Sequence, residues 1–259
     1  MSNFEYILVN IKNMLLVLKE YKLNAFTQFF NQIIYFATFF LFFEALSSLL
    51  GGLQYSRLEL FVYLILIDLC VTGIGIFDWG KSLKQDITRG VFNSYLIRPK
   101  NIFLLYQFSR LNSNAFTQHI VGWFVLVGLV IYYELMYLFS VGVMILLVFV
   151  FIFYVLIRFM TSSISFYNFA LSEILYQNVF RAGSSAFKQY PAQFFELFPY
   201  QKLLMIFPMF FMGALVFELG LFNSFMISYF LILLFLISVC IVTTFLLWKF
   251  GLRRYDAYS

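Results

Sequence analysis

The chain has 259 residues, of which 63% are apolar and only 11% are charged, and its formal net charge is +5. Soluble domains carry about a quarter charged residues, so this composition excludes a water-soluble globular enzyme. A membrane crossing takes about 20 apolar residues, so the length accommodates about six or seven crossings. No room is left for a separate soluble catalytic domain.

The first segment, residues 3–24, is predicted to be an amphipathic helix at the membrane surface. Apolar residues such as Phe4, Leu8 and Leu15 recur at helical spacing, with lysines between them. No basic start, apolar core and small-residue cleavage site follow one another, so the segment does not have the pattern of a signal peptide.

Six apolar runs follow, and each is long enough to cross a bilayer as a helix. The sequence therefore predicts an all-α polytopic membrane protein that forms a single transmembrane domain over residues 1–259. The predicted crossings are residues 26–48, 58–79, 111–133, 140–163, 200–219 and 224–248.

Positive charge predicts the orientation, because short segments rich in Lys and Arg remain in the cytoplasm. Of the 17 Lys and Arg residues, all except Arg57 fall on one side of this topology. Both termini are therefore expected in the cytoplasm, which requires an even number of crossings.

Residues 164–198 are predicted to form an interfacial or re-entrant segment, and both alternatives remain open at this point. Glu173, Arg181 and Lys188 make a seventh full crossing expensive. Pro191 and Pro199 interrupt the segment further.

The residues needed for metal, disulfide or nucleotide chemistry are sparse. The chain has two cysteines, Cys70 and Cys240, both in apolar runs, and one histidine, so neither a disulfide framework nor a Cys/His metal cluster is expected. Residues 75–82 match the spacing of a phosphate-binding loop, but bulky Phe77 and Trp79 occupy it and a membrane crossing precedes it. We expect no cofactor, metal or nucleic acid to bind this chain.

Three residues inside the predicted crossings are candidates for a substrate path or a dimer interface. Asp68 lies near the centre of the second crossing, where a carboxylate must face protein or water. His119, in the third crossing, is close enough in predicted depth to hydrogen-bond it, and Pro208 is expected to kink the fifth. The alternative for Asp68 and His119 is a structural hydrogen bond between helices.

The loop after the second crossing, residues 81–98, is predicted to be a short amphipathic helix parallel to the membrane. A helix of this kind can offer its exposed face to a cytosolic partner. The alternative is a surface helix that only joins two crossings. Residues 86–99 read DITRGVFNSYLIRP. This run resembles the segment with Gly, then Leu, then Arg-Pro that follows the second crossing in six-span permeases of type-2 ATP-binding-cassette exporters.

The resemblance implies that residues 81–98 are a coupling helix that contacts a separate cytosolic ATPase. The residues that it marks for coupling are Asp86, Arg89, Gly90, Tyr95, Arg98 and Pro99. It also implies a second permease chain, identical or similar, and a prokaryotic plasma membrane as the location. ATP and Mg would be used by the partner ATPase, and this chain would be a transport subunit and no enzyme.

Two other classes of function, a secondary transporter or channel and a membrane-embedded enzyme, fit the sequence less well. A secondary transporter or channel needs more intramembrane ionisable residues, or a repeated pair of broken helices, than the sequence holds. A membrane-embedded enzyme lacks the paired carboxylates and histidines for acid-base or metal chemistry. The preferred hypothesis is the membrane-spanning permease of an ATP-driven exporter.

Overall fold

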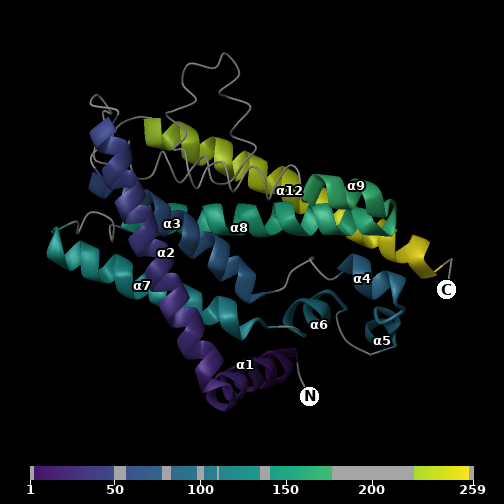
Figure 1. Ribbon diagram of the computed structural model, residues 1–259. Coiled ribbons are helices and arrows are strands. Elements are labelled where there is room, and N and C mark those ends of the chain that lie inside the picture. The colour runs from purple at the N-terminus through teal and green to yellow at the C-terminus, as the bar shows by residue number, and fades with distance from the viewer. Residues whose placement is uncertain are drawn as a thin grey trace.

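We describe the computed structural model of the chain over residues 3–49, 57–77, 83–97, 102–109, 111–134, 141–176 and 225–256. Every named element in these ranges is a helix (Figure 1). The helices are α1 (Asn3–Glu20), α2 (Lys22–Leu49), α3 (Arg57–Ile76), α4 (Leu83–Thr88), α5 (Asn93–Leu96), α6 (Ile102–Phe108), α7 (Ser113–Tyr132), α8 (Val141–Ser163), the 3₁₀ turn η2 (Ile164–Phe166), α9 (Phe169–Ile174) and α12 (Phe225–Asp256).

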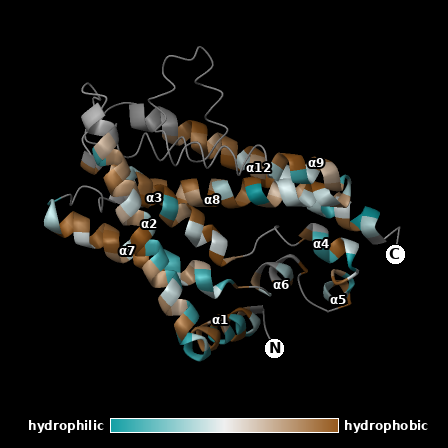
Figure 2. Cartoon of the chain, in the orientation of Figure 1, coloured by the Kyte–Doolittle hydropathy of each residue, from teal (hydrophilic) through white to brown (hydrophobic). Residues whose placement is uncertain are grey.

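Four helical stretches are long and apolar enough to cross a membrane. They are Lys22–Ala45, Ser113–Tyr132, Ile145–Phe166 and Phe230–Tyr255. They overlap the predicted first, third, fourth and sixth crossings, and the last two extend three and seven residues beyond the predicted ends. Figure 2 shows apolar residues over most of α7, α8 and α12, whereas α1 alternates between apolar and polar residues.

The predicted second crossing coincides with α3, whose apolar stretch, Leu60–Ile76, is shorter than the other four. This helix is the centre of the fold, since Leu60, Leu64 and Ile67 have no exposed surface. It packs against α2, α7 and α8. A helix that is apolar on all sides is expected in such a central position. The predicted fifth crossing, residues 200–219, lies outside the described residues, as does Pro208.

Close approach of α3 and α7 depends on Gly122. A Cβ atom at this position would lie 2.8 Å from Cδ2 of Leu69 on α3. Inside a membrane the hydrophobic effect does not drive helices together, so close packing of their backbones matters more. Small residues at helix crossings allow that close approach. The pair α8 and α12 forms the second main contact of the bundle, with Phe149 and Phe230 meeting edge to face at 5.2 Å.

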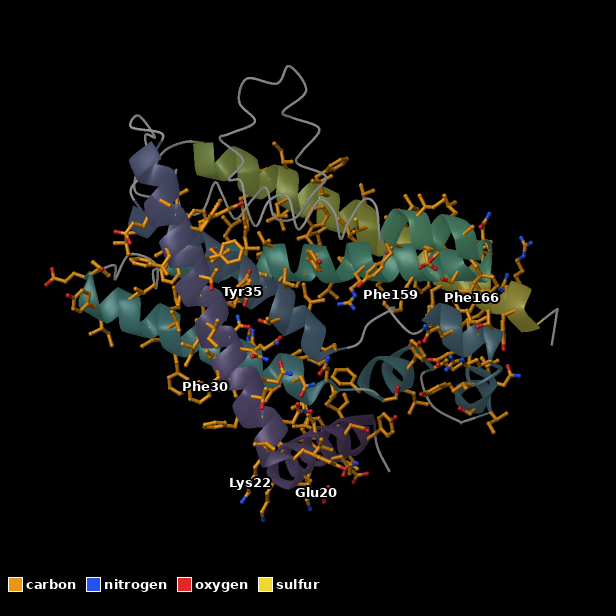
Figure 3. All side chains as sticks on the ribbon, in the orientation of Figure 1. Glu20, Lys22, Phe30, Tyr35, Phe159 and Phe166 are labelled. Carbon is orange, nitrogen blue, oxygen red and sulfur yellow. The ribbon has the colours of Figure 1, made fainter. Side chains whose placement is uncertain are left out.

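The chain bends at Tyr21, between α1 and α2, and Figure 3 shows Glu20 and Lys22 on the outside of this bend. The predicted surface helix, residues 3–24, therefore ends four residues earlier than expected. One side of α1 packs on the fold through buried Met14 and through Tyr6, whose hydroxyl donates to the carbonyl of Leu105 at 3.4 Å. Phe4, Leu8 and Leu15 remain exposed on another side.

The helices α1 and α12 both contact the short helices between α3 and α7, at one end of the bundle (Figure 1). These short helices are α4, α5 and α6. The Phe77–Leu111 bridge brings the end of α3 next to the start of α7, and the Asn112 amide donates to the Ile76 carbonyl at 2.7 Å. Tyr255, near the end of α12, donates a hydrogen bond to Oδ1 of Asn93. The helices α1, α4, α5 and α6 and the end of α12 therefore lie together.

The beginning of the segment 164–198 folds back from α8. After η2, the side chain of Asn168 accepts a hydrogen bond from the Leu171 amide at 3.0 Å and begins α9. Asn is a common helix N-cap because its side-chain oxygen satisfies a free backbone N–H. Residues 177–198 lie outside the described residues.

Candidate functional site

The predicted coupling helix is residues 81–98, and its described part, residues 83–97, consists of two short helices and not one continuous helix. α4 ends at Thr88 and α5 begins at Asn93. Between them Gly90 has a φ of 70°, a conformation that glycine adopts without the strain that a Cβ brings. The Phe92 amide donates to the Asp86 carbonyl at 3.1 Å and closes the turn. The described segment is therefore a helix–turn–helix, which we call the α4–α5 unit.

Phe92 anchors this unit to the bundle. Its side chain has no exposed surface, and it lies in a cluster of buried residues that we call the Phe92 cluster. The cluster comprises Leu83, Phe92, Tyr95, Leu105, Tyr106, Phe159, Phe166 and Trp248. Its members come from α4, α5, α6, α8, η2 and α12, and Figure 3 shows Phe159 and Phe166 at the end of α8 that adjoins α4.

Ring contacts connect Phe92 directly to η2 and to the long helix α12. Its ring centroid lies 5.6 Å from that of Phe166, 6.1 Å from that of Trp248 and 5.5 Å from that of Tyr255, all edge to face. Edge-to-face pairs of this kind add about 0.5–1.5 kcal/mol to the burial of the rings. The α4–α5 unit is therefore held against η2 and α12 as well as being joined through the chain to α3 and α6.

Two of the predicted coupling residues point into the protein. Asp86 is only 3% exposed, and its Oδ2 accepts a hydrogen bond from the Tyr106 hydroxyl at 2.9 Å. Tyr95 is also buried and donates to Oγ of Ser109 at 3.1 Å. These side chains hold the unit in place and do not form its outer surface.

The outer surface of the unit is formed by other residues. Arg89 and Gly90 are exposed, and Val91 and Ile97 are exposed apolar residues, the latter at 84%. Ile97 is the last described residue of this segment, and Arg98 and Pro99 lie outside the described residues. The exposed side chains of the unit therefore include one arginine, a residue that is enriched in protein interfaces, and two aliphatic groups.

Residues near the end of α12 contact η2 and Tyr167 beside the Phe92 cluster, and we call this contact region the junction. The sequence did not identify these residues. A Cβ atom on Gly251 would lie 2.6 Å from Cδ2 of Phe166, and the Tyr167 hydroxyl donates to the Leu247 carbonyl at 3.2 Å. Burial raises the pKa of Tyr167, which outweighs the opposite effect of Arg254, so the donor stays protonated at neutral pH. The available signal was the spacing of Trp248, Leu252 and Tyr255, which places them on one face of the helix.

The second predicted group, Asp68 and His119, belongs to a chain of hydrogen bonds that is buried at Asp68 and partly buried at His119. Nε2 of Gln32 on α2 donates to Oδ2 of Asp68 at 2.6 Å. Thr72, one turn from Asp68, donates to the Asp68 carbonyl at 2.7 Å and lies 3.2 Å from Nδ1 of His119. The prediction that Asp68 and His119 lie at similar depth is consistent with this chain, in which Thr72 stands between them.

Trp123 ends the chain and determines the hydrogen-bonding roles of the imidazole. Its Nε1 donates to Nε2 of His119 at 3.0 Å, so Nε2 is an acceptor. Since the Thr72 hydroxyl already donates to Asp68, its oxygen is available to accept from Nδ1 of His119. These hydrogen bonds thus connect α2, α3 and α7. Gln32, Thr72 and Trp123 were not singled out from the sequence, although polar residues in apolar runs are a recognised signal.

The described residues hold no group of three or more His, Cys, Asp or Glu side chains arranged to bind a metal ion. Within the same part of the chain, the arrangement consists of apolar helices, a polar hydrogen-bond chain between them and a helix–turn–helix at one end. This combination defines a multi-pass helical membrane protein.

Comparison with known families identifies the class further. The profile of the ABC-2 family transporter proteins matches residues 9–259, so the chain belongs to this family. It is a non-catalytic membrane component of an ABC transporter, as the resemblance of residues 86–99 indicated. No curated protein and no solved structure matches the chain.

Proposed function

We propose that this chain is the permease of an ATP-driven exporter and that its α4–α5 unit docks on a separate cytosolic ATPase. The observation that carries the proposal is the two-sided character of the unit. Phe92, Asp86 and Tyr95 fasten one side to the bundle, while Arg89, Val91 and Ile97 are exposed on the other. A unit built in this way transmits a force from a bound partner to α8, η2 and α12, on which it packs.

The proposal includes six crossings with both termini in the cytoplasm. The α4–α5 unit, α1 and the end of α12 lie together at one end of the bundle, as this topology requires. Lys12 and Lys19 belong to α1, and Arg253 and Arg254 belong to the end of α12, so the positive-inside rule favours a cytoplasmic position for both helix ends. The exposed apolar residues of α1, with its lysines, support an interfacial position for that helix.

Coupling then works as a mechanical shift between two packed states. ATP and Mg bind to the partner ATPase, whose closure moves the α4–α5 unit. Because the Phe92 cluster joins this unit to α8, η2 and α12, we infer that the movement reaches these helices directly, in addition to α3 and α7 through the chain. Packed interfaces change between discrete arrangements, which converts a small displacement into opening or closing of a path. A second permease chain, identical or similar, would form the other half of that path.

For the hydrogen-bond chain from Gln32 to Trp123 we propose a structural role. Its donors and acceptors pair with one another across three helices, and such bonds hold transmembrane helices together. A cargo-binding role would instead require that cargo replace one of these partners.

The test is co-purification of the partner ATPase with this chain in mild detergent. Ile97→Asp places a charge on the exposed side of the unit, and we expect it to remove most of the bound ATPase while the permease still inserts and folds. Tyr132→Asp is the matched control, because Tyr132 is similarly exposed at the far end of α7. Retention of the ATPase by the Ile97 variant at the level of the control would contradict the proposal.

A further inference from the structure

A cavity of about 200 Å³ lies between α3, α7 and α8. Its lining consists of Leu66, Leu69, Cys70, His119, Trp123, Leu147, Val148 and Phe151. Val148 is 55% exposed, so the cavity reaches the surface of the bundle. Both α7 and α8 are long and apolar enough to cross a membrane, which favours bilayer hydrocarbon as the medium next to this opening.

The two polar side chains in the wall do not call for a polar ligand. The ring nitrogens of His119 and the indole N–H of Trp123 are engaged with Thr72 and with each other. An apolar cavity of about 150 Å³ is known to hold a molecule the size of benzene, while sites for drug-sized ligands begin near roughly 300 Å³. The cavity is thus of a size for one end of an acyl chain and not for a whole lipid.

A cation stands on the same face of α8 as this cavity. Arg158 follows Phe151 by seven residues, which is two helical turns or about 10 Å along the axis. Its guanidinium carbon lies 5.6 Å from the centre of the Tyr176 ring. Within the described part of the chain, its Nε is buried and has no hydrogen-bond partner.

The position of Arg158 along α8 suits a lipid headgroup. The stretch that is long and apolar enough to cross a membrane ends at Phe166, eight residues or about 12 Å further on, and a long side chain that extends towards this end covers much of that distance. A buried N–H without a partner is unusual and costs free energy until an acceptor arrives. The planar guanidinium matches the oxygens of a phosphate.

We propose that this face of α8 binds one anionic phospholipid, with its phosphate on Arg158 and the end of one acyl chain in the cavity. The two-turn separation leaves space for the glycerol and the first part of the chain between the two contacts. The site does not depend on ATPase docking, since neither contact involves the α4–α5 unit.

The experiment uses the full chain in phosphatidylcholine vesicles and the fluorescence of Trp123, taken as the difference from the Trp123→Phe protein. Phosphatidylglycerol or phosphatidylcholine with brominated acyl chains is added as the quencher. We expect brominated phosphatidylglycerol to reach half of its maximal quenching at a mole fraction about five-fold lower than brominated phosphatidylcholine. Arg158→Gln should remove this preference, Arg158→Lys should keep part of it, and Arg253→Gln, an exposed control on α12, should leave it intact.

A second pair of variants tests the cavity. Val148→Phe narrows the opening and should lower the maximal quenching of Trp123, whereas Ile145→Phe, exposed on α8 outside the lining, should not. Identical curves for the two lipids, or an unchanged preference in Arg158→Gln, overturn the proposal. Loss of the preference when inorganic phosphate is added also overturns it, because the site would then be a phosphate site and not a lipid site.

Discussion

Phe166 and Gly251 are packed so closely that a Cβ atom added to Gly251 would lie 2.6 Å from Cδ2 of the phenylalanine ring. This contact brings η2 against the end of α12 and closes one side of the Phe92 cluster. The end of α12 therefore approaches η2 closely because position 251 has no side chain.

The first prediction concerns this contact. Gly251→Ala should lower stability by about 1–3 kcal/mol, since overpacking forces neighbouring groups apart. Gly128→Ala is the control, because no atom lies within 4 Å of an added Cβ there and alanine favours the helix by about 0.5–1 kcal/mol. Thermal unfolding in detergent measures both, and equal melting temperatures for the two variants would show that the close contact is not maintained.

The second prediction concerns the turn between α4 and α5. Gly90→Ala should cost about 1–2 kcal/mol because alanine is strained at a φ of 70°. No atom lies within 4 Å of the added Cβ, so the cost comes from the backbone alone. Gly90→Asn should be milder, since asparagine tolerates this conformation better. Stability and retention of the ATPase should fall together in the alanine variant, and a result in which asparagine is the more harmful would contradict the assignment.

The third prediction concerns the buried Asp86–Tyr106 hydrogen bond. Tyr106→Phe should lower stability by about 1.5–3 kcal/mol, as expected for loss of a buried hydrogen bond to a carboxylate. In a double-mutant cycle, Tyr106→Phe should have a much smaller effect when Asp86→Ala is already present. Fully additive effects would show that the two side chains do not interact.

These residues show how far sequence reasoning reaches. Long apolar runs predicted α2, α7, α8 and α12 because any segment surrounded by lipid must satisfy its backbone polar groups within itself. The junction was not predictable in the same way. Phe92 and Trp248 are far apart in the chain, and periodicity within a helix does not say which distant helix its face meets. The amphipathic pattern of residues 81–98 similarly concealed the break at Gly90.

The buried polar residues teach a related lesson. The position of Asp68 in an apolar run was sufficient to predict that it needs partners inside the protein. The sequence suggested His119 as a partner, but the chain of hydrogen bonds passes through Thr72, and Gln32 of another helix contacts the carboxylate. Depth in a membrane is readable from sequence, whereas the rotation of each helix is decided by packing.

The fourth prediction separates the two interpretations of this polar chain. Thr72→Val should lower stability by about 0.6 kcal/mol, the average for hydrogen bonds between membrane helices. Asp68→Asn retains an acceptor for Gln32 and should leave both folding and transport largely intact. Transport that collapses in Asp68→Asn while the melting temperature is unchanged would favour a cargo-binding role instead.

The most direct test of the whole account is to determine on which side of the membrane the α4–α5 unit lies. Ile97→Cys is introduced into a chain in which Cys70 and Cys240 are replaced by alanine, and a membrane-impermeant maleimide is applied to intact cells and to inverted vesicles. We expect labelling only in the inverted vesicles, and less of it when the ATPase is bound, while Tyr132→Cys at the opposite end should be labelled in intact cells. Labelling of the residue 97 cysteine from outside intact cells would contradict the account.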